Sequence, residues 1–183
     1  MYYRIVMEPS LDCGLVELER RFKAYKSYFL RGMSLDVKTI PVPWQFTVRP
    51  NPRHPLVMDD YYPAFHLMSQ RMVDALQGAG ATNLQIFSAQ VRNLETGHVR
   101  DDFVVVNIVG LISCAVDEKS QSTPIADRRY FLNLVIDETR ARGVPVFRLA
   151  ESQLDVIVCE EVAKALRNAQ LRSVSLEPVA APD

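Results

Sequence analysis

The chain has 183 residues, 48% of them hydrophobic and 23% charged, with a net charge of −1. This balance is that of a soluble globular protein with the length of one ordinary domain. The near-zero net charge gives no global field that would attract nucleic acid or an anionic membrane. The three cysteines, Cys13, Cys114 and Cys159, share no CxxC spacing, so a disulfide framework and a zinc site are both disfavoured.

The organisation of the chain is expected to be simple. The first residues lack a basic start followed by an apolar stretch, and no window holds the roughly 18 apolar residues that a membrane helix needs. We therefore expect a cytoplasmic protein with no membrane partner. Residues 1–183 are predicted to form a single domain, with a frayed tail at 179–183. No internal repeat is recognisable.

The first third of the sequence is predicted to contain a strand, a helix and a proline-rich extended segment. Residues 2–7 are typical of a strand. Apolar residues at spacings of three and four predict an amphipathic helix over 15–29, ending near Gly32. Residues 41–63 hold six of the eleven prolines, so this stretch is predicted to be extended chain, with a short strand at 45–48.

Two helices are predicted in the rest of the chain. One has an apolar stripe from Phe65 to Ala79, with Ser69 placed to cap its first turn. The other covers residues 162–169. The polar stretch 117–127 is predicted to be a loop. Strands are predicted at 84–91, 103–109, 131–136, 144–149, 154–158 and 174–176. Because helices and strands do not alternate regularly, the favoured class is α+β: a mostly antiparallel mixed sheet packed with two or three helices.

The sequence offers no recognisable catalytic or cofactor motif. The three histidines, His54, His66 and His98, have neither helical metal-pair spacing nor an HExxH motif. Glycine-rich phosphate loops and serine-nucleophile motifs are absent. Cys159 precedes a helix, but Glu160 and Glu161 oppose ionisation of its thiol. We therefore predict no catalytic residue, no metal, no cofactor and no enzyme activity.

One basic segment supports a different hypothesis. Residues 20–53 contain eight cations and only one acid, with Phe22, Tyr25, Tyr28 and Phe29 interleaved. Aromatic and basic residues together are typical of single-strand nucleic-acid platforms. The same aromatics follow helical spacing, which indicates a core with a solvated basic face. Nucleic-acid binding, or partner recognition through this segment, stays an alternative.

Several motifs in order resemble a known family. They are the segments at 69–76, 80–87, 106–110 with Ser120, 147–151 and 157–162. Together they are similar to a family of small bacterial immunity proteins of polymorphic-toxin systems, first catalogued as a domain of unknown function and common in social, predatory bacteria. The resemblance covers residues 44–178 and fits the first forty residues poorly. It supplies no catalytic residues.

The resemblance implies an immunity protein that neutralises a cognate toxin, encoded nearby, by stoichiometric protein–protein inhibition. Toxin–immunity pairs can be among the tightest complexes known, through a few buried aromatic and charged anchors. We predict Asp59, Asp60, Tyr61 and Tyr62 as partner-binding anchors, because flanking prolines limit the entropy lost on ordering. In the alternative interpretation, the tyrosines pack on the core and the acids are solvated.

Two further possibilities stay open from the sequence. A small-ligand enzyme or regulator would require a deep pocket with several titratable groups of perturbed pKa. Homo-oligomerisation is also left open.

Overall fold

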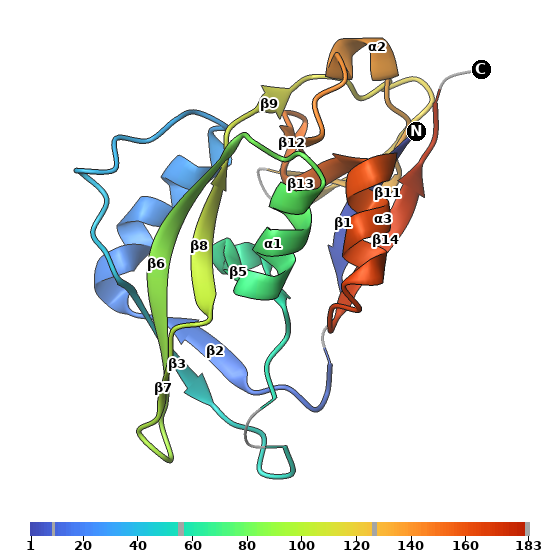
Figure 1. Ribbon diagram of the computed structural model, residues 1–183. Helices are drawn as coiled ribbons and strands as arrows, with labels where there is room; N and C mark the ends of the chain where they lie inside the picture. Colours follow the sequence, from blue (N-terminus) through green and yellow to red (C-terminus); the bar gives the residue numbers. More distant parts are fainter. Residues whose placement is uncertain (9, 55–56, 126–127, 182–183) are drawn as a thin grey trace.

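The computed structural model describes residues 1–8, 10–54, 57–125 and 128–181. The fold is mixed α/β, with more strand than helix (Figure 1). Helices α1 (Gln70–Gly78) and α3 (Glu160–Asn168) lie between two sheets. The other helical segments are α2 (Glu138–Ala141) and the 3₁₀-helices η1 (Arg20–Leu30) and η2 (Pro63–Phe65).

The strands form two main sheets instead of the one predicted. The seven-stranded sheet has the order β2 (Leu15–Leu18), β3 (Trp44–Arg49), β6 (Leu84–Asn93), β8 (Phe103–Ile108), β5 (Leu67–Ser69) and β4 (Tyr61–Tyr62), with β7 (Val99–Arg100) paired to β6. The five-stranded sheet has the order β14 (Val174–Val179), β1 (Tyr2–Met7), β13 (Ser152–Cys159), β12 (Val146–Leu149) and β9 (Leu111–Ile112). Strands β10 (Gln121–Ile125) and β11 (Arg128–Asn133) form a separate hairpin.

Antiparallel pairing dominates, as predicted. Within the described residues the parallel pairs of named strands are β3 with β6 and β9 with β12. The run Phe103–Ile108 is buried on both faces of its sheet, which explains why it is continuously apolar. Phe103 and Val105 face one cluster, whereas Val104 and Val106 face another.

Several predicted elements differ from the structure. The helix predicted from the apolar stripe at Phe65 begins only at Gln70, after η2 and β5. Residues 15–29 form strand β2 followed by η1, because the pattern at 15–18 alternates between exposed and buried with a period of two. The predicted loop at 117–127 contains β10, whose strand partner β11 lies beyond it. The predicted frayed tail begins inside β14, where Val179 is buried and pairs with Tyr2; residues 182–183 lie outside the described residues.

The molecule contains an internal structural repeat that the sequence did not reveal. The first repeat comprises β4, β5, α1, β6 and β8, and the second comprises β12, β13, α3, β14 and β1. Helix α1 begins at Gln70 and α3 at Glu160, and the same offset aligns the strands on either side. Along the two helices the pattern of buried and exposed residues is almost the same.

The strand registers of the two repeats are identical. Ser69 pairs with Phe103 at one end of β5 in the first repeat, as Cys159 pairs with Tyr2 in the second. The remaining pairs of the first repeat also have equivalents in the second. The two repeats therefore share the same strand register as well as the same overall shape. Examples of equivalent pairs are Leu84 with Ile108 and Val174 with Met7, then Tyr61 with Met68 and Val146 with Val158.

This duplication is hidden in the sequence for two reasons. Between residues 67–88 and 157–178 the matched positions share identical residues only at 75/165, 76/166 and 79/169. The strand that completes the second repeat, β1, also lies at the opposite end of the chain from β14. A search for consecutive similar segments therefore misses one strand of the second unit.

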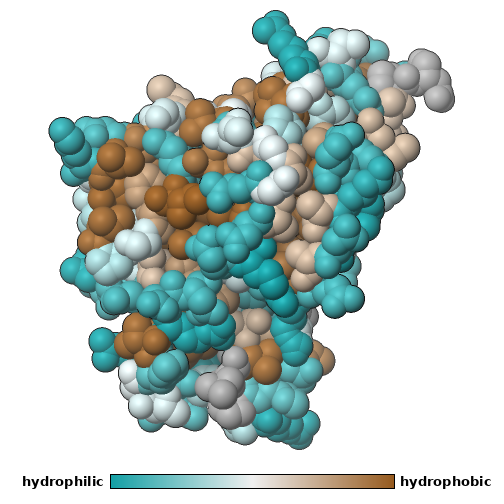
Figure 2. Space-filling view, viewed as in Figure 1, coloured by the Kyte–Doolittle hydropathy of each residue, from teal (hydrophilic) through white to brown (hydrophobic). Residues whose placement is uncertain are grey.

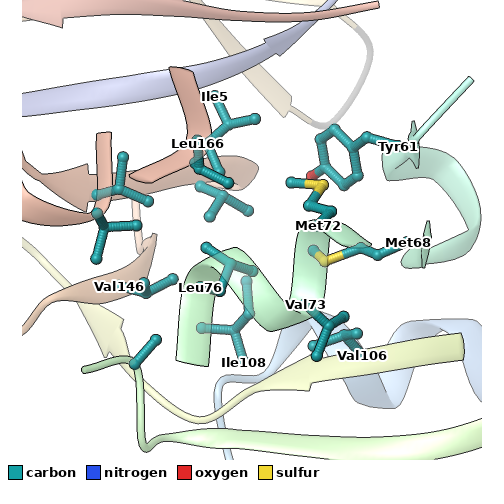
Figure 3. Packing of buried hydrophobic residues seen from close by; sticks show 14 of the residues in the cluster. Ile5, Tyr61, Met68, Met72, Val73, Leu76, Val106, Ile108, Val146 and Leu166 are labelled. Carbon is teal, nitrogen blue, oxygen red and sulfur yellow. The ribbon is translucent and has the colours of Figure 1, made fainter. Parts of the chain in front are cut away.

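The two repeats share one central core. Equivalent positions contribute side chains to it from both repeats, as with Leu76 and Leu166 in the helices or Val106 and Ile5 in the strands. Figure 3 shows these side chains converging from both sheets and both helices. Because α1 and α3 also contact each other, each repeat covers the apolar face of the other. The single-domain organisation of the chain stays a prediction.

The outer faces of the sheets have covers of their own. Segment 20–40 covers the seven-stranded sheet, where Phe22 stacks on Trp44 and Phe29 meets the same indole edge-on. The β10–β11 hairpin and α2 cover the five-stranded sheet, through buried Phe131 and Ala141. Each sheet is thus buried on both faces over much of its area.

The repeat predicts a stabilising substitution. Gly80 and Gln170 both follow a helix with positive φ, +91° and +49°, and their N–H groups bond to the equivalent carbonyls of Gln77 and Arg167. Left-handed backbone strains a residue with a Cβ but not glycine. Gln170→Gly should therefore stabilise the protein by about 0.5–1 kcal/mol. Urea denaturation measures the change.

Ala169→Gly is the matched control, because Ala169 has a right-handed φ of −70° and should lose stability with glycine. A destabilised Gln170→Gly protein would contradict the equivalence of the two helix ends.

Candidate functional site

The predicted binding residues 59–62 are buried. Asp59, Asp60, Tyr61 and Tyr62 are between 3% and 7% exposed. The two tyrosines form β4 and pack into two different apolar clusters. Burial raises the pKa of Tyr61 to about 12. The tyrosines therefore pack as the alternative interpretation expected, whereas the two acids differ from it because they are not solvated.

The two acids fasten the first repeat to the turn that follows α3 in the second. The Asp59 carboxylate accepts a hydrogen bond from the Ser173 hydroxyl. The Asp60 carboxylate accepts the backbone N–H of Arg172 at 2.6 Å and pairs with the guanidinium of Arg71 at 2.6 Å. A buried carboxylate needs such partners to offset the loss of hydration.

The turn after α1 in the first repeat makes the equivalent polar contact with the second repeat. The Asn83 amide, in the turn after α1, donates to the carbonyls of Val109 and Val146 at 2.7 and 2.8 Å. In both repeats this turn also binds the strand that pairs with it: Val109 N–H donates to the Asn83 carbonyl, and Glu8 N–H donates to the Ser173 carbonyl. The two repeats thus hold each other by reciprocal polar contacts at both ends of their shared core.

A role in partner binding for residues 59–62 stays a prediction. Their side chains make contacts within the protein, and the acids connect the two repeats. Any contribution to recognition would act through the shape of the surface above them, since hot-spot side chains must be accessible to a partner.

A buried histidine and a buried arginine meet between the repeats. His66 Nδ1 lies 2.9 Å from Arg148 Nη2, and the ring stacks on Phe29. Burial and the Arg148 charge lower the pKa of His66 to about 3, so the neutral imidazole accepts this hydrogen bond. His66 also has a left-handed backbone, with φ of +55°. At this position His66 is the C-cap residue of η2, where its backbone N–H donates to the Pro63 carbonyl.

A recess that we call the lysine pocket opens over His66. It has a volume of about 370 Å³ and lies between η1, which covers the seven-stranded sheet, and the start of β13. Lys23 and Lys26 line one side, and Leu154 lines another. No carboxylate occurs among the described residues that line it. The pocket is therefore basic, with an apolar margin.

A second surface combines exposed apolar residues. Segment 32–35 lies along β6 and β8, because Leu35 N–H donates to Gln85 and the Asn107 amide donates to the Met33 carbonyl. Figure 2 shows apolar patches on this side of the molecule, broken by polar groups. The exposed apolar residues of this region are Met33, Val37, Val42, Ile86 and Leu111. Surfaces of this kind are typical of protein-binding faces.

The basic segment 20–53 is only partly available to nucleic acid. Its aromatic residues Phe22 and Phe29 are buried in the core, so they cannot stack on bases. Tyr28 is exposed but lies under the guanidinium of Arg31. The nucleic-acid alternative stays a prediction with a smaller aromatic platform than the sequence suggested.

The reactive side chains lie apart. His66 contacts Arg148 and Phe29. Cys159 occupies the N-cap position of α3 without a side-chain capping hydrogen bond, and burial raises the pKa of its thiol. Cys13 donates to the Asp59 carboxylate, and burial together with that contact raises its pKa to about 12. Among the described residues, no three His, Cys, Asp or Glu side chains are placed to hold a metal ion.

These features define a mixed α/β protein whose polar groups join two repeats and line a basic recess. No helix in the described part of the chain is long and apolar enough to cross a membrane. The model of an immunity protein family, Imm11, matches residues 3–181, and the chain therefore belongs to this family. The prediction of an immunity protein family is confirmed. No curated protein gives a significant match to the chain.

The match also includes the N-terminal segment, where the sequence resemblance was poor. Its strand β1 is the inner strand that completes the second repeat, and η1 covers the first sheet. Residues 3–40 therefore belong to the region that the family model matches, although their sequence resemblance was poor.

We predict that His66 makes stability depend on pH. The unfolded chain binds a proton near pH 6.5, whereas folded His66 does not until about pH 3. Stability contributed by this residue is present above pH 6.5 and is lost as pH falls toward 3, at up to about 1.4 kcal/mol per pH unit. In His66→Asn this part of the loss should disappear, while the amide keeps an acceptor and tolerates the left-handed backbone.

The difference between variant and wild type in urea denaturation from pH 4 to 7 isolates this residue from titrating carboxylates. His98→Gln, at an exposed position, is the control and should follow the wild-type curve. Parallel curves for His66→Asn and wild type would contradict a neutral buried imidazole.

The structural role of Asp60 gives a separate prediction. Asp60→Ala leaves the Arg172 N–H unpaired and should destabilise the fold by about 1–3 kcal/mol. Asp101→Ala, which changes an exposed acid, should alter stability by less than about 0.5 kcal/mol. Thermal denaturation followed by circular dichroism compares them. Unchanged stability in Asp60→Ala would show that the joint between the repeats does not depend on this carboxylate.

Proposed function

We propose that this protein binds a toxin encoded by a neighbouring gene and neutralises it stoichiometrically in the cytoplasm. The observation that carries the proposal is the family match over residues 3–181. Immunity proteins protect their own cell by binding, so the proposed mechanism is occlusion or distortion of the toxin's active site and involves no turnover.

The construction of the fold supports this role. Two repeats share one core and are joined by hydrogen bonds at both ends, so the surface loops are attached to a preorganised framework. Preorganisation reduces the entropy lost on binding and so increases affinity for a given contact area. The exposed apolar residues around segment 32–43 and the nearby lysine pocket offer contacts of two different kinds.

An enzyme or small-ligand regulator has less support. That alternative requires titratable groups that converge in a closed cleft. In the lysine pocket the described lining residues include lysines and His66 but no acid to act with them. In the groove beside β9, of about 620 Å³, the described charged lining residues are Arg140 and Arg142.

Co-expression with the product of the adjacent gene tests the proposal. We expect the protein to restore growth to cells that express the toxin and to elute with it as a 1:1 complex on size exclusion. Leu166→Asp, which places a charge in the shared core, should lose both effects because the fold is lost. Continued toxicity together with separate elution of the two wild-type proteins would refute the proposed function.

A further inference from the structure

The lysine pocket carries two cations on one face of its helix. Lys23 and Lys26 are three residues apart in η1, and side chains at this spacing eclipse each other in a 3₁₀-helix. The Lys26 ammonium lies 4.9 Å from the centre of the Phe65 ring, which holds it near the pocket. Two lysine side chains from the same helix thus line this recess.

Behind the pocket lies a third positive charge. Arg148 is 1% exposed and donates to the Gln153 carbonyl and to His66, both of which are neutral. Its Nε–H is buried without a hydrogen-bond partner, and among the described residues no carboxylate acts on its charge as an ion-pair partner. A buried cation without a counter-ion is costly, and its field extends into the adjacent recess.

The margin of the pocket is apolar. Leu154 is 37% exposed on the β13 side, and Leu30 lines the η1 side. The recess of about 370 Å³ is large enough for one or two side chains of a partner. A fitting ligand therefore has a negative group for the floor and an apolar portion for the margin.

We propose that the lysine pocket receives an acidic side chain of the toxin, flanked by an apolar residue that contacts Leu154. The carboxylate lies between Lys23 and Lys26, and the charge of Arg148 acts on it from behind the His66 ring. This inference rests on the proposed function and adds to it the contact surface and the chemistry of the partner.

A protein carboxylate fits better than a nucleic-acid phosphate. A strand of nucleic acid needs a continuous basic track with accessible rings, and Phe22 and Phe29 of this region are buried. The protein also has a net charge of −1, so no general attraction to polyanions reinforces the pocket. A single recess with an apolar margin suits one anchored side chain.

Charge reversal in the pocket tests the proposal. We expect Lys23→Glu/Lys26→Glu to bind the adjacent gene's toxin about 100-fold or more weakly than wild type, mainly through faster dissociation. Lys38→Glu/Arg49→Glu changes the net charge by the same amount at exposed positions outside the pocket, and should weaken binding less than about fivefold. Surface plasmon resonance at two salt concentrations compares the three proteins.

A milder variant separates binding from folding. Lys23→Gln/Lys26→Gln removes both charges without adding repulsion and should weaken binding about tenfold, with a circular dichroism spectrum and melting temperature close to wild type. If this variant is folded and binds as tightly as wild type, the pocket is not the contact site. An equal loss in the Lys38→Glu/Arg49→Glu control would also overturn the inference, because general charge would then explain the effect.

The outcomes distinguish the inference from the proposed function. If wild type forms no complex with the toxin, the proposed function fails and this inference fails with it. If the complex survives charge reversal unchanged, only the inference fails. A 20-nucleotide single-stranded RNA is the competing probe: tight RNA binding that the reversal abolishes, with toxin binding unaffected, would assign the pocket to nucleic acid instead.

Discussion

The contact between α1 and α3 is the interaction on which the rest of the structure depends. Each helix covers the inner face of its own sheet, but neither repeat can bury that face fully without the other. Leu76 of α1 and Leu166 of α3 occupy equivalent positions in the shared core, so the two helices contribute the same side chain to it. The reciprocal hydrogen bonds of Asn83 and Asp60 then fix how the repeats are placed, and the recess above His66 exists because that placement leaves a gap between η1 and β13.

The sequence predicted elements well wherever local signals determine structure. The Ser69 cap, the apolar run from Phe103 and the strand Tyr2–Met7 all follow from short-range patterns, and the structure confirms them. The sequence-based prediction failed at residues 15–29, where the three-residue spacing of a 3₁₀-helix resembles that of an α-helix. It also missed β4 and β5, which are too short to show a period; β5 is held by pairing with β8, and β4 by pairing with β5.

The candidate site was harder to predict than the fold. Residues 59–62 have the composition of a binding loop, yet their burial is set by partners at 172–173 that are distant in sequence. His66 and Arg148 are likewise ordinary residues in isolation, and only the packing of one repeat against the other brings them together. The basic segment did mark one wall of the lysine pocket, through Lys23 and Lys26, but the floor and the apolar margin had no local signal. Contacts between distant segments determine such a site, so periodicity along the chain does not reveal it.

The position of β1 has a consequence for how the chain matures during translation. This strand is translated before the whole of the first repeat, but its neighbours in the sheet, β13 and β14, are translated after that repeat. The strands of the first repeat follow one another in the chain and are able to pair before β13 is translated. The apolar side chains of β1 have no neighbouring strand to pair with until then. Closure of the second sheet is therefore a late event of high contact order, and a ribosome-bound chain exposes the Tyr3 and Ile5 side chains to chaperones until that closure occurs.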